Sequence, residues 1–277
     1  MISSLVNCRG GVVEFGPLKL KHCRYGWMLF SGPYIGKCFE LYGEYSESEV
    51  ALMADFIQPG DTVIDVGANI GDLTLPMARL VGASGKVYAF ESHSVNYHTL
   101  CANIALNQIC TVKTINAFAG AADSEPDAVY TSDIFPVSTV TIDSLALSDC
   151  MLIKIDVEGH ELEVLQGAAE TISTHKPVLY FENDRKAYSA ALLEYALGLN
   201  YRLYWHLAPI FRPNNFFGNP VNQWAPKNIL SLMVLGVPQN FEHQVSGLPE
   251  ITTSDSWWKD LKPPTRNDEL PKKQAGS

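Results

Sequence analysis

The stretch VIDVGANIGDLT, residues 63–74, decides the fold. It opens with the short, almost fully apolar run VIDVGA (63–68), which is typical of a strand buried on both faces of a sheet. A turn that ends at Gly71 leads from this strand into a helical stretch at 73–81. A buried strand, a glycine-bearing turn and a helix in this order predict the first unit of a doubly wound α/β domain.

The same alternation of apolar runs and helical stretches continues along the chain. Helices are expected at 95–107, 160–172 and 186–198. Strands separated by helices of this length specify a mostly parallel sheet covered on both faces. We therefore predict a doubly wound, mostly parallel, seven-stranded Rossmann-like sheet whose last strand is antiparallel. Its further strands are expected at 86–91, 111–120, 151–159, 177–183, 201–206 and 229–236.

Three other parts of the chain have a different character. Residues 1–45 alternate short β-like runs with Gly and Pro turns and are predicted to be a β-rich lead-in to the main domain at 46–237. Within that domain, 207–228 lacks periodicity, and such a long loop is usually functional. We predict that it binds a substrate, called the acceptor below. Its aromatic residues are expected either to carry the acceptor or to pack the loop onto the core: Phe211, Phe216, Phe217 and Trp224. The tail, 238–277, is expected to be flexible, with Trp257 and Trp258 docking on the body.

Composition narrows the classes of partner. The 277 residues include 30 acidic and 20 basic side chains, a net charge of −10, which disfavours binding to nucleic acid. No apolar run is long enough for a membrane span, and the first dozen residues lack the apolar core of a signal peptide, so we expect a cytoplasmic protein. The six scattered cysteines have no zinc-site spacing and are predicted to be free thiols.

The first turn favours a ligand without phosphate. A dinucleotide-binding turn needs G-x-G-x-x-G, whereas this one has only Gly67 and Gly71. These glycines are expected to let the backbone approach an adenosyl-amino acid such as S-adenosylmethionine, whose carboxylate the helix start would receive. Asp65 is predicted to meet the ammonium group of that ligand, either directly or through water.

The next strand ends supply the remaining contacts to this cofactor. Glu91 closes the second strand, where a carboxylate can accept both ribose hydroxyls. Asn116 and Ala117 follow the third strand and are predicted to touch the adenine edge. The residues Asn69, Ser92 and Asn96 lie in or beside the same turns and complete the predicted cofactor site.

Several segments together resemble the FkbM family of methyltransferases. The resemblance covers about residues 44–235 and is most specific in the paired motifs DVGANIG (65–71) and KIDVEGHE (154–161). It implies S-adenosylmethionine as donor and O-methylation of sugars or hydroxylated natural products. It also implies that Glu44 and Tyr45 lie over the cofactor. The chain departs from the family where an aromatic residue and a proline are usual, at Asp72 and Ser92.

The candidate residues for catalysis stand at two adjacent strand ends. Asp156 and His160 follow the strand at 151–159, and Glu182 and Asn183 close the next strand. His160 is the predicted general base, because imidazole titrates near neutral pH, although it could instead only bond to a neighbouring carboxylate. Asp156, Glu182 and Asn183 offer the oxygen donors that Mg²⁺ prefers, as at the same strand ends of catechol-type O-methyltransferases, so a magnesium ion is a further candidate cofactor.

Two alternatives to a sugar or natural-product O-methyltransferase stay open. One is an N-methyltransferase of the same fold, since an amine needs less activation than a hydroxyl. The other is a non-catalytic S-adenosylmethionine-binding interaction module, which the acidic residues and histidine at the strand ends argue against. A nicotinamide-dependent oxidoreductase is disfavoured by the missing central glycine of the first turn. The expected partner is a small-molecule or glycan acceptor, and the oligomeric state cannot be derived from the sequence.

Overall fold

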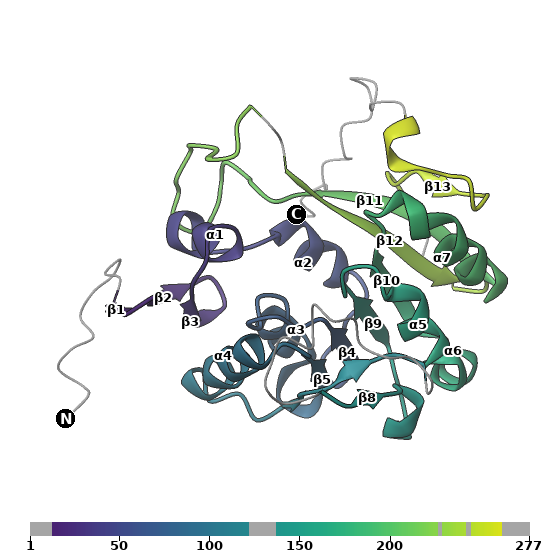
Figure 1. Ribbon diagram of the computed structural model, residues 1–277, viewed down its shortest axis with the longest axis horizontal. Coiled ribbons are helices and arrows are strands. Elements are labelled where there is room, and N and C mark those ends of the chain that lie inside the picture. The colour runs from purple at the N-terminus through teal and green to yellow at the C-terminus, as the bar shows by residue number, and fades with distance from the viewer. Residues whose placement is uncertain (1–12, 122–136, 227–228, 242–244, 262–277) are drawn as a thin grey trace, which may run out of the picture.

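The computed structural model describes residues 13–121, 137–226, 229–241 and 245–261. Their centre is one eight-stranded sheet in the order β13-β11-β12-β10-β9-β4-β5-β6 (Figure 1). The strands of this sheet are β4 (Thr62–Val66), β5 (Lys86–Phe90), β6 (Val112–Ile115), β9 (Leu152–Ile155), β10 (Val178–Glu182), β11 (Tyr201–Pro209), β12 (Leu230–Pro238) and β13 (Glu250–Ile251).

The directions of these strands confirm the predicted topology. Five neighbours in the sheet, β10, β9, β4, β5 and β6, pair in parallel. Strand β12 lies antiparallel between β10 and β11. The short β13 pairs with β11 and makes the sheet one strand wider than predicted. Strands β7 (Phe118–Ala119) and β8 (Thr139–Val140) form a separate parallel pair.

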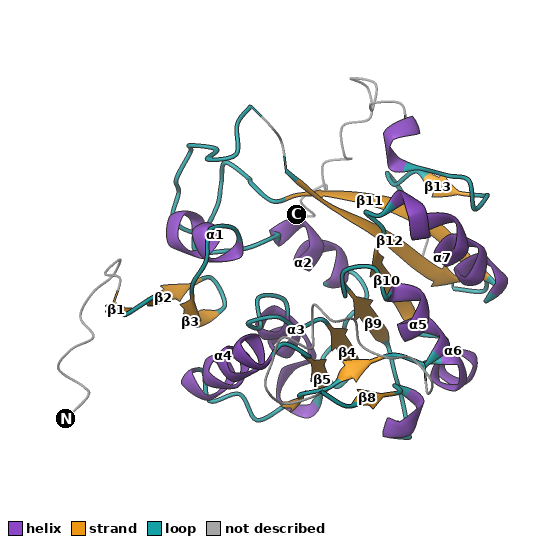
Figure 2. Ribbon diagram, in the orientation of Figure 1, coloured by secondary structure: helices purple, strands orange, loops and turns teal. Residues whose placement is uncertain are grey.

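Helices cover both faces of the sheet, as Figure 2 shows. Side chains of α5 (Glu161–Gln166), α6 (Ala169–His175) and α7 (Lys186–Gly198) pack on one face together with Ile64. On the other face, α2 (Glu47–Met53) and α3 (Thr74–Val81) pack with Val63. Successive residues of a strand point to opposite faces, so the apolar run that starts at Val63 supplies both cores.

The lead-in is a small sheet docked on the main domain. Strands β1 (Val13–Phe15), β2 (Leu18–Cys23) and β3 (Gly26–Phe30) are antiparallel. Asn103 and Asn107 on α4 (Ser94–Leu106 and its C-cap) accept from the backbone amides of Leu29 and Trp27, which fastens β3 to the domain. The lead-in then forms helix α1 (Ile35–Tyr42), which the turn-like sequence around Pro33 and Gly36 did not predict.

One further prediction needs correction. The single helix expected at 160–172 is two helices, which meet around Gly167, where a Cβ would lie 2.1 Å from the carbonyl oxygen of Gly120. The predicted docking of Trp257 is confirmed, since it packs edge-on against the indole of Trp205, from which the neighbouring Ser256 accepts at 2.9 Å. The predictions for residues 1–12, 227–228 and 262–277 lie outside the described residues.

Two bulk properties can be stated for the described part of the chain. No helix there is long and apolar enough to cross a membrane. Its five cysteines are free thiols, and burial raises the pKa of Cys23, Cys38 and Cys150 to about 12. These three are therefore uncharged core residues at neutral pH.

The turn after β4 passes directly over the end of β9. Gly67 has φ +76°, and a Cβ there would lie 1.8 Å from the backbone oxygen of Asp156. The same turn is closed by Gly71 at φ +91°, where a Cβ would lie 2.9 Å from Leu100. Packing within the protein thus favours glycine at both positions, and because Gly67 also lines the cleft, the close approach of a ligand to it stays a prediction.

We expect Gly67→Ala to lower the free energy of unfolding by about 3 kcal/mol or more, because the new methyl adds a backbone clash to the cost of a left-handed conformation. Gly247→Ala is the matched control, since Gly247 has φ +78° and no atom within 4 Å of its virtual Cβ. That variant should lose only about 1–2 kcal/mol. Urea denaturation of both variants measures the difference, and equal losses would show that the clash with β9 has no energetic weight.

Candidate active site

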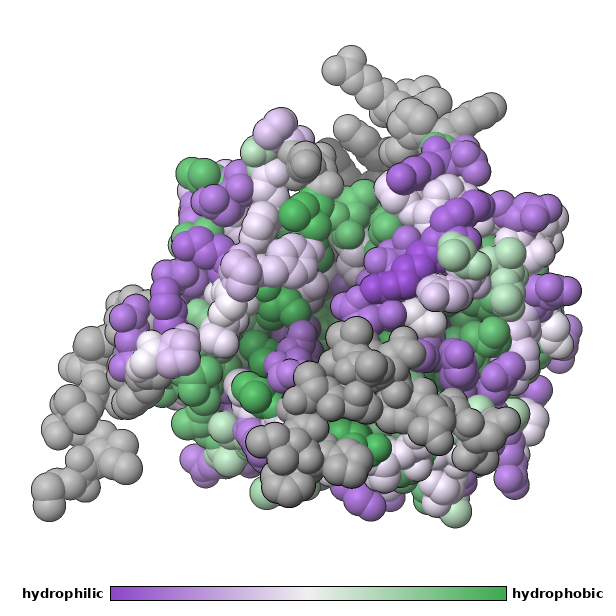
Figure 3. Space-filling view, in the orientation of Figure 1, coloured by the Kyte–Doolittle hydropathy of each residue, from purple (hydrophilic) through white to green (hydrophobic). Residues whose placement is uncertain are grey.

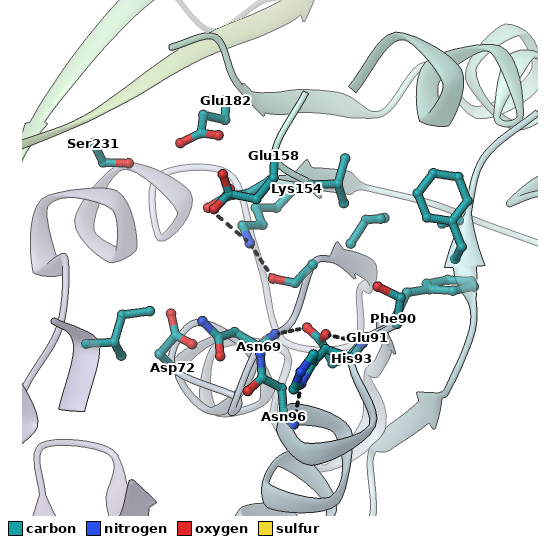
Figure 4. A pocket seen from close by; sticks show the side chains of 18 of the residues that line it. Asn69, Asp72, Phe90, Glu91, His93, Asn96, Lys154, Glu158, Glu182 and Ser231 are labelled. Carbon is teal, nitrogen blue, oxygen red and sulfur yellow. Dashed lines mark hydrogen bonds and ion pairs between the residues drawn. The ribbon is translucent and has the colours of Figure 1, made fainter. Parts of the chain in front are cut away.

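A cleft of about 350 Å³ opens at the carboxyl ends of β4, β5, β9 and β10. Figure 3 shows hydrophobic side chains in the hollow at the centre of this face and hydrophilic side chains beside it. Figure 4 shows two opposed walls. We call the side with Asn69, Asp72 and Glu91 the first-turn wall. The side that carries Asp156, Glu158 and Glu182 is the acidic wall.

Glu91 is the fixed point of the first-turn wall. Its two carboxylate oxygens accept from the backbone amides of Asn69 and His93, each at 2.7 Å. Burial raises the pKa of Glu91, and these two amides oppose the rise. His93 also caps α4 by accepting from the amide of Asn96. The carboxylate is thereby held in one orientation, with acceptor capacity left on each oxygen.

A buried lysine, Lys154, contacts residues at the ends of both β4 and β9. Lys154 is 2% exposed, donates to the carbonyl of Gly67 at 3.1 Å and pairs with Asp65 at 3.3 Å and Asp156 at 3.9 Å. Burial opposes its charge, but Asp65 and Asp156 outweigh that effect and raise the pKa of Lys154. Asp65 also accepts from the hydroxyl of Thr74 at 2.6 Å and does not line the cleft. Asp65 therefore holds Lys154 and α3, which corrects its predicted role as a ligand of the ammonium group.

The acidic wall contains a pair of carboxyl groups that share a proton. Burial and the neighbouring Asp156 raise the pKa of Glu182 to about 10. Burial also raises the pKa of Asp156, although Lys154 and a hydrogen bond from Glu182 favour its charged form. Two close carboxyl groups cannot both ionise easily, so the pair retains a proton at neutral pH, as the raised pKa of Glu182 indicates. Arg185 contacts Glu182 and Glu158 from outside the cleft.

His160 and Asn183 do not reach this cleft. The ring of His160 stands edge-on to Phe118, with centroids 5.1 Å apart, and its Nδ1 lies 3.9 Å from Glu163. The buried amide of Asn183 donates to Ser189 on α7 at 3.1 Å. Within the described residues, no group of three His, Cys, Asp or Glu side chains is placed to hold a metal ion. The predicted histidine base therefore does not line the cleft, and Asn183 does not join Asp156 and Glu182, the other two predicted magnesium ligands, in its lining.

Comparison with known proteins assigns the chain to a family. Residues 65–203, half of the chain, match the methyltransferase FkbM domain. The chain belongs to the FkbM methyltransferase family. A hexuronic acid methyltransferase, AglP of Haloferax volcanii, is 26% identical over 150 residues, which cover 49% of this FkbM-family chain and 60% of that protein. The match thus spans less than two thirds of that relative.

Two solved structures of methyltransferases are also similar to this FkbM-family chain. The methyltransferase FkbM of Methylobacillus flagellatus KT is 19% identical, with a TM-score of 0.48, and the match covers 68% of this chain and 50% of that one. An S-adenosylmethionine-dependent O-methyltransferase of Thermotoga maritima is 15% identical with a TM-score of 0.48, and the match covers 85% and 80% of the two chains.

The cleft of this FkbM-family chain brings together most of the predicted site residues. The predicted residues that line it are Tyr45, Gly67, Asn69, Glu91, Ser92, Asn96, Ala117, Asp156 and Glu182. Those that lie outside its lining are Glu44, Asp65, Gly71, Asn116, His160 and Asn183. Asn116 is close behind, where its amide donates to the carbonyl of Glu91 at 2.8 Å.

Other lining residues escaped the sequence analysis, among them Tyr34, His93, Lys154 and Ser231. Lys154 had a readable signal, because a lysine inside the apolar strand LIKI must find a buried anionic partner. Asp72 lines the cleft too, although the sequence marked it only as a departure from the family pattern. Burial raises its pKa to about 7.

Glu44 joins the lead-in to the long loop between β11 and β12. Its buried carboxylate accepts from Arg24 at 2.8 Å, from Arg212 at 2.5 Å and from the backbone amide of Phe216 at 2.7 Å. We call these contacts of Glu44 with Arg24, Arg212 and Phe216 the latch. Glu44 does not line the cleft, which differs from its predicted position over the cofactor. The loop aromatics also pack on the lead-in and α1, since the ammonium of Lys21 lies 3.9 Å from the ring centre of Phe217. None of the four predicted loop aromatics lines the described cleft.

Replacing Lys154 tests the buried ion cluster. We expect Lys154→Met to lower the free energy of unfolding by about 3–5 kcal/mol, because it leaves Asp65 and Asp156 without their cation. Lys113→Met, at an exposed position of β6, should change it by about 0.5 kcal/mol or less. Urea denaturation at neutral pH measures both, and similar values for the two variants would contradict the structural role of Lys154.

Replacing Glu44 tests the latch. We expect Glu44→Gln to speed amide hydrogen exchange in residues 211–224 by about tenfold, because two charge-assisted hydrogen bonds that hold the loop are weakened. Glu40→Gln is the control, since Glu40 pairs with Lys19 and Lys37 within the lead-in. Exchange of the loop amides at the wild-type rate in Glu44→Gln would rule out the latch.

Proposed function

We propose that this FkbM-family chain is an S-adenosylmethionine-dependent O-methyltransferase that acts on a hydroxyl of a sugar, glycoside or other hydroxylated natural product. The observation that carries the proposal is the Glu91 carboxylate, fixed at the end of β5 by two backbone amides. A carboxylate held in this way is suited to the two neighbouring hydroxyls of a ribose. The apolar surface of Phe90 and Ala117 beside it is suited to an adenine ring.

The chemistry that the donor supplies is an electrophilic methyl group on a sulfonium. The protein must align an acceptor oxygen with that methyl and receive the acceptor's proton. In our proposal Asp156 receives it, because this residue lines the cleft and Lys154 and Glu182 both favour its charged form. Burial and Asp156 raise the pKa of Glu182 to about 10, so Glu182 keeps its proton at neutral pH and orients Asp156 through a hydrogen bond. No step of this proposal is routed through a metal ion.

The proposal for the acceptor class rests on the relative and on the net charge of the chain. AglP is a hexuronic acid methyltransferase, so a sugar acceptor is a reasonable starting point for a screen. The net charge of −10 supports the expectation that nucleic acid is not the acceptor. Placement in the cytoplasm stays a prediction.

Calorimetric titration tests the donor site. We expect the protein to bind S-adenosylhomocysteine and not NAD, and Glu91→Gln to weaken binding by about tenfold or more, because the amide cannot accept from both backbone amides and both ribose hydroxyls. Glu194→Gln, at an exposed position of α7, should bind like the wild type. Binding of NAD, or equal affinity in the two variants, would refute the donor assignment. Methylated sugars, detected by mass spectrometry after incubation with S-adenosylmethionine, then identify acceptors.

A further inference from the structure

Asp72 lines the cleft, and one of its carboxylate oxygens has no hydrogen-bond partner among the described residues. It follows Gly71 in the first turn and lines the first-turn wall (Figure 4). Its Oδ1 atom is buried and has no hydrogen-bond partner among the residues that the structure describes. A buried acceptor that no protein group satisfies is costly, and a cationic donor from a ligand would remove that cost.

The nearby cation is already engaged elsewhere. Lys154 donates to Gly67 and forms ion pairs with Asp65 and Asp156, whereas on Asp72 it acts only through its charge, which opposes the rise in the pKa of that residue. Asp65, the other carboxylate of the first turn, is fully buried behind the wall and bonded to Thr74. Asp72 is therefore the carboxylate of this turn that a ligand in the cleft can reach.

The order of residues along the wall indicates which part of a ligand Asp72 would meet. In Figure 4, Glu91, Asn69 and Asp72 follow one another along the same side of the cleft. If Glu91 receives the ribose, as in the proposed function, the amino-acid arm of the donor extends past Asn69 toward Asp72. That arm carries a primary ammonium group.

Resting on the proposed function, we infer that Asp72 binds the α-ammonium group of S-adenosylmethionine and thereby takes the role predicted for Asp65. The contact is a charge-assisted hydrogen bond in a partly desolvated site, where such bonds are strong. Burial raises the pKa of Asp72, and Lys154 and the backbone amide of Asp72 oppose the rise without a hydrogen bond to Oδ1, so a cation at that oxygen would stabilise the charged form. Glu158 and Glu182 lie on the opposite side of the cleft (Figure 4).

Two nucleoside ligands isolate this contact. S-Adenosylhomocysteine carries the α-ammonium group, whereas 5′-methylthioadenosine has the same adenosine and thioether without the amino-acid arm. We expect Asp72→Asn to weaken binding of S-adenosylhomocysteine by about tenfold or more. Its affinity for 5′-methylthioadenosine should stay within about twofold of wild type, since the adenosine contacts are unchanged. Calorimetric titration of the full-length wild type and variant with both ligands gives the four dissociation constants.

A second variant separates a specific contact from a general loss of negative charge. Glu158→Gln removes a carboxylate from the acidic wall and should shift the affinities for the two ligands by the same small factor. Equal losses for both ligands in Asp72→Asn would overturn the assignment in favour of a structural role for Asp72. Unchanged affinities in Asp72→Asn together with impaired methyl transfer would overturn it in favour of an acceptor contact. A wild type that binds neither ligand would refute the proposed function itself and this inference with it.

Discussion

The ammonium group of Lys154 is the interaction on which the cleft depends. It lies at the junction of β4 and β9, where it bonds to the carbonyl of Gly67 and pairs with Asp65 and Asp156. A lysine at 2% exposure is tolerated only because carboxylates surround it, and those carboxylates are tolerated only because of the lysine. The cluster therefore fixes the relative position of two strand ends. Because Gly67 and Asp156 also line the cleft, the same contacts set its shape.

The second constraint lies above the sheet, where segments far apart in the sequence meet. Glu44 draws together Arg24 of the lead-in and Arg212 of the long loop, and it is 4% exposed. The strand that leaves this loop, β12, contributes Ser231 to the cleft. The lead-in contributes Tyr34 and Tyr45. The contacts of Glu44 thus position the upper rim of the cleft, and those of Lys154 position its floor, where they also hold Asp156, the residue to which we assign the acceptor's proton.

The sequence predicted what depends on periodicity and on strand ends, and it failed where one residue serves a distant neighbour. The apolar runs identified the sheet, and the rule that ligands bind at the carboxyl ends of parallel strands located Glu91, Asp156 and Glu182. The same rule could not distinguish a side chain that faces the cleft from one turned behind it, as Asp65 and Asn183 are. The sequence singled out Gly67 and Gly71 for a ligand, but it could not show that the backbone of Asp156 and the side chain of Leu100 also restrict these positions to glycine. His160 follows the right strand but turns to Phe118.

Charge and backbone geometry lead to the same class of ligand. The first turn lacks the central glycine that admits a pyrophosphate. The described lining of the cleft carries several carboxylates, and its one lysine or arginine is Lys154, which is already paired with Asp65 and Asp156. A phosphate group would find neither a backbone cradle nor a free positive charge there. A sulfonium and an ammonium, by contrast, would enter a partly desolvated space in which carboxylates outnumber cations and Oδ1 of Asp72 has no hydrogen-bond partner among the described residues. The carboxylates of the whole cleft therefore favour a cationic donor. Asp72, which follows Gly71 where an aromatic residue is usual in the family, adds a further carboxylate to them.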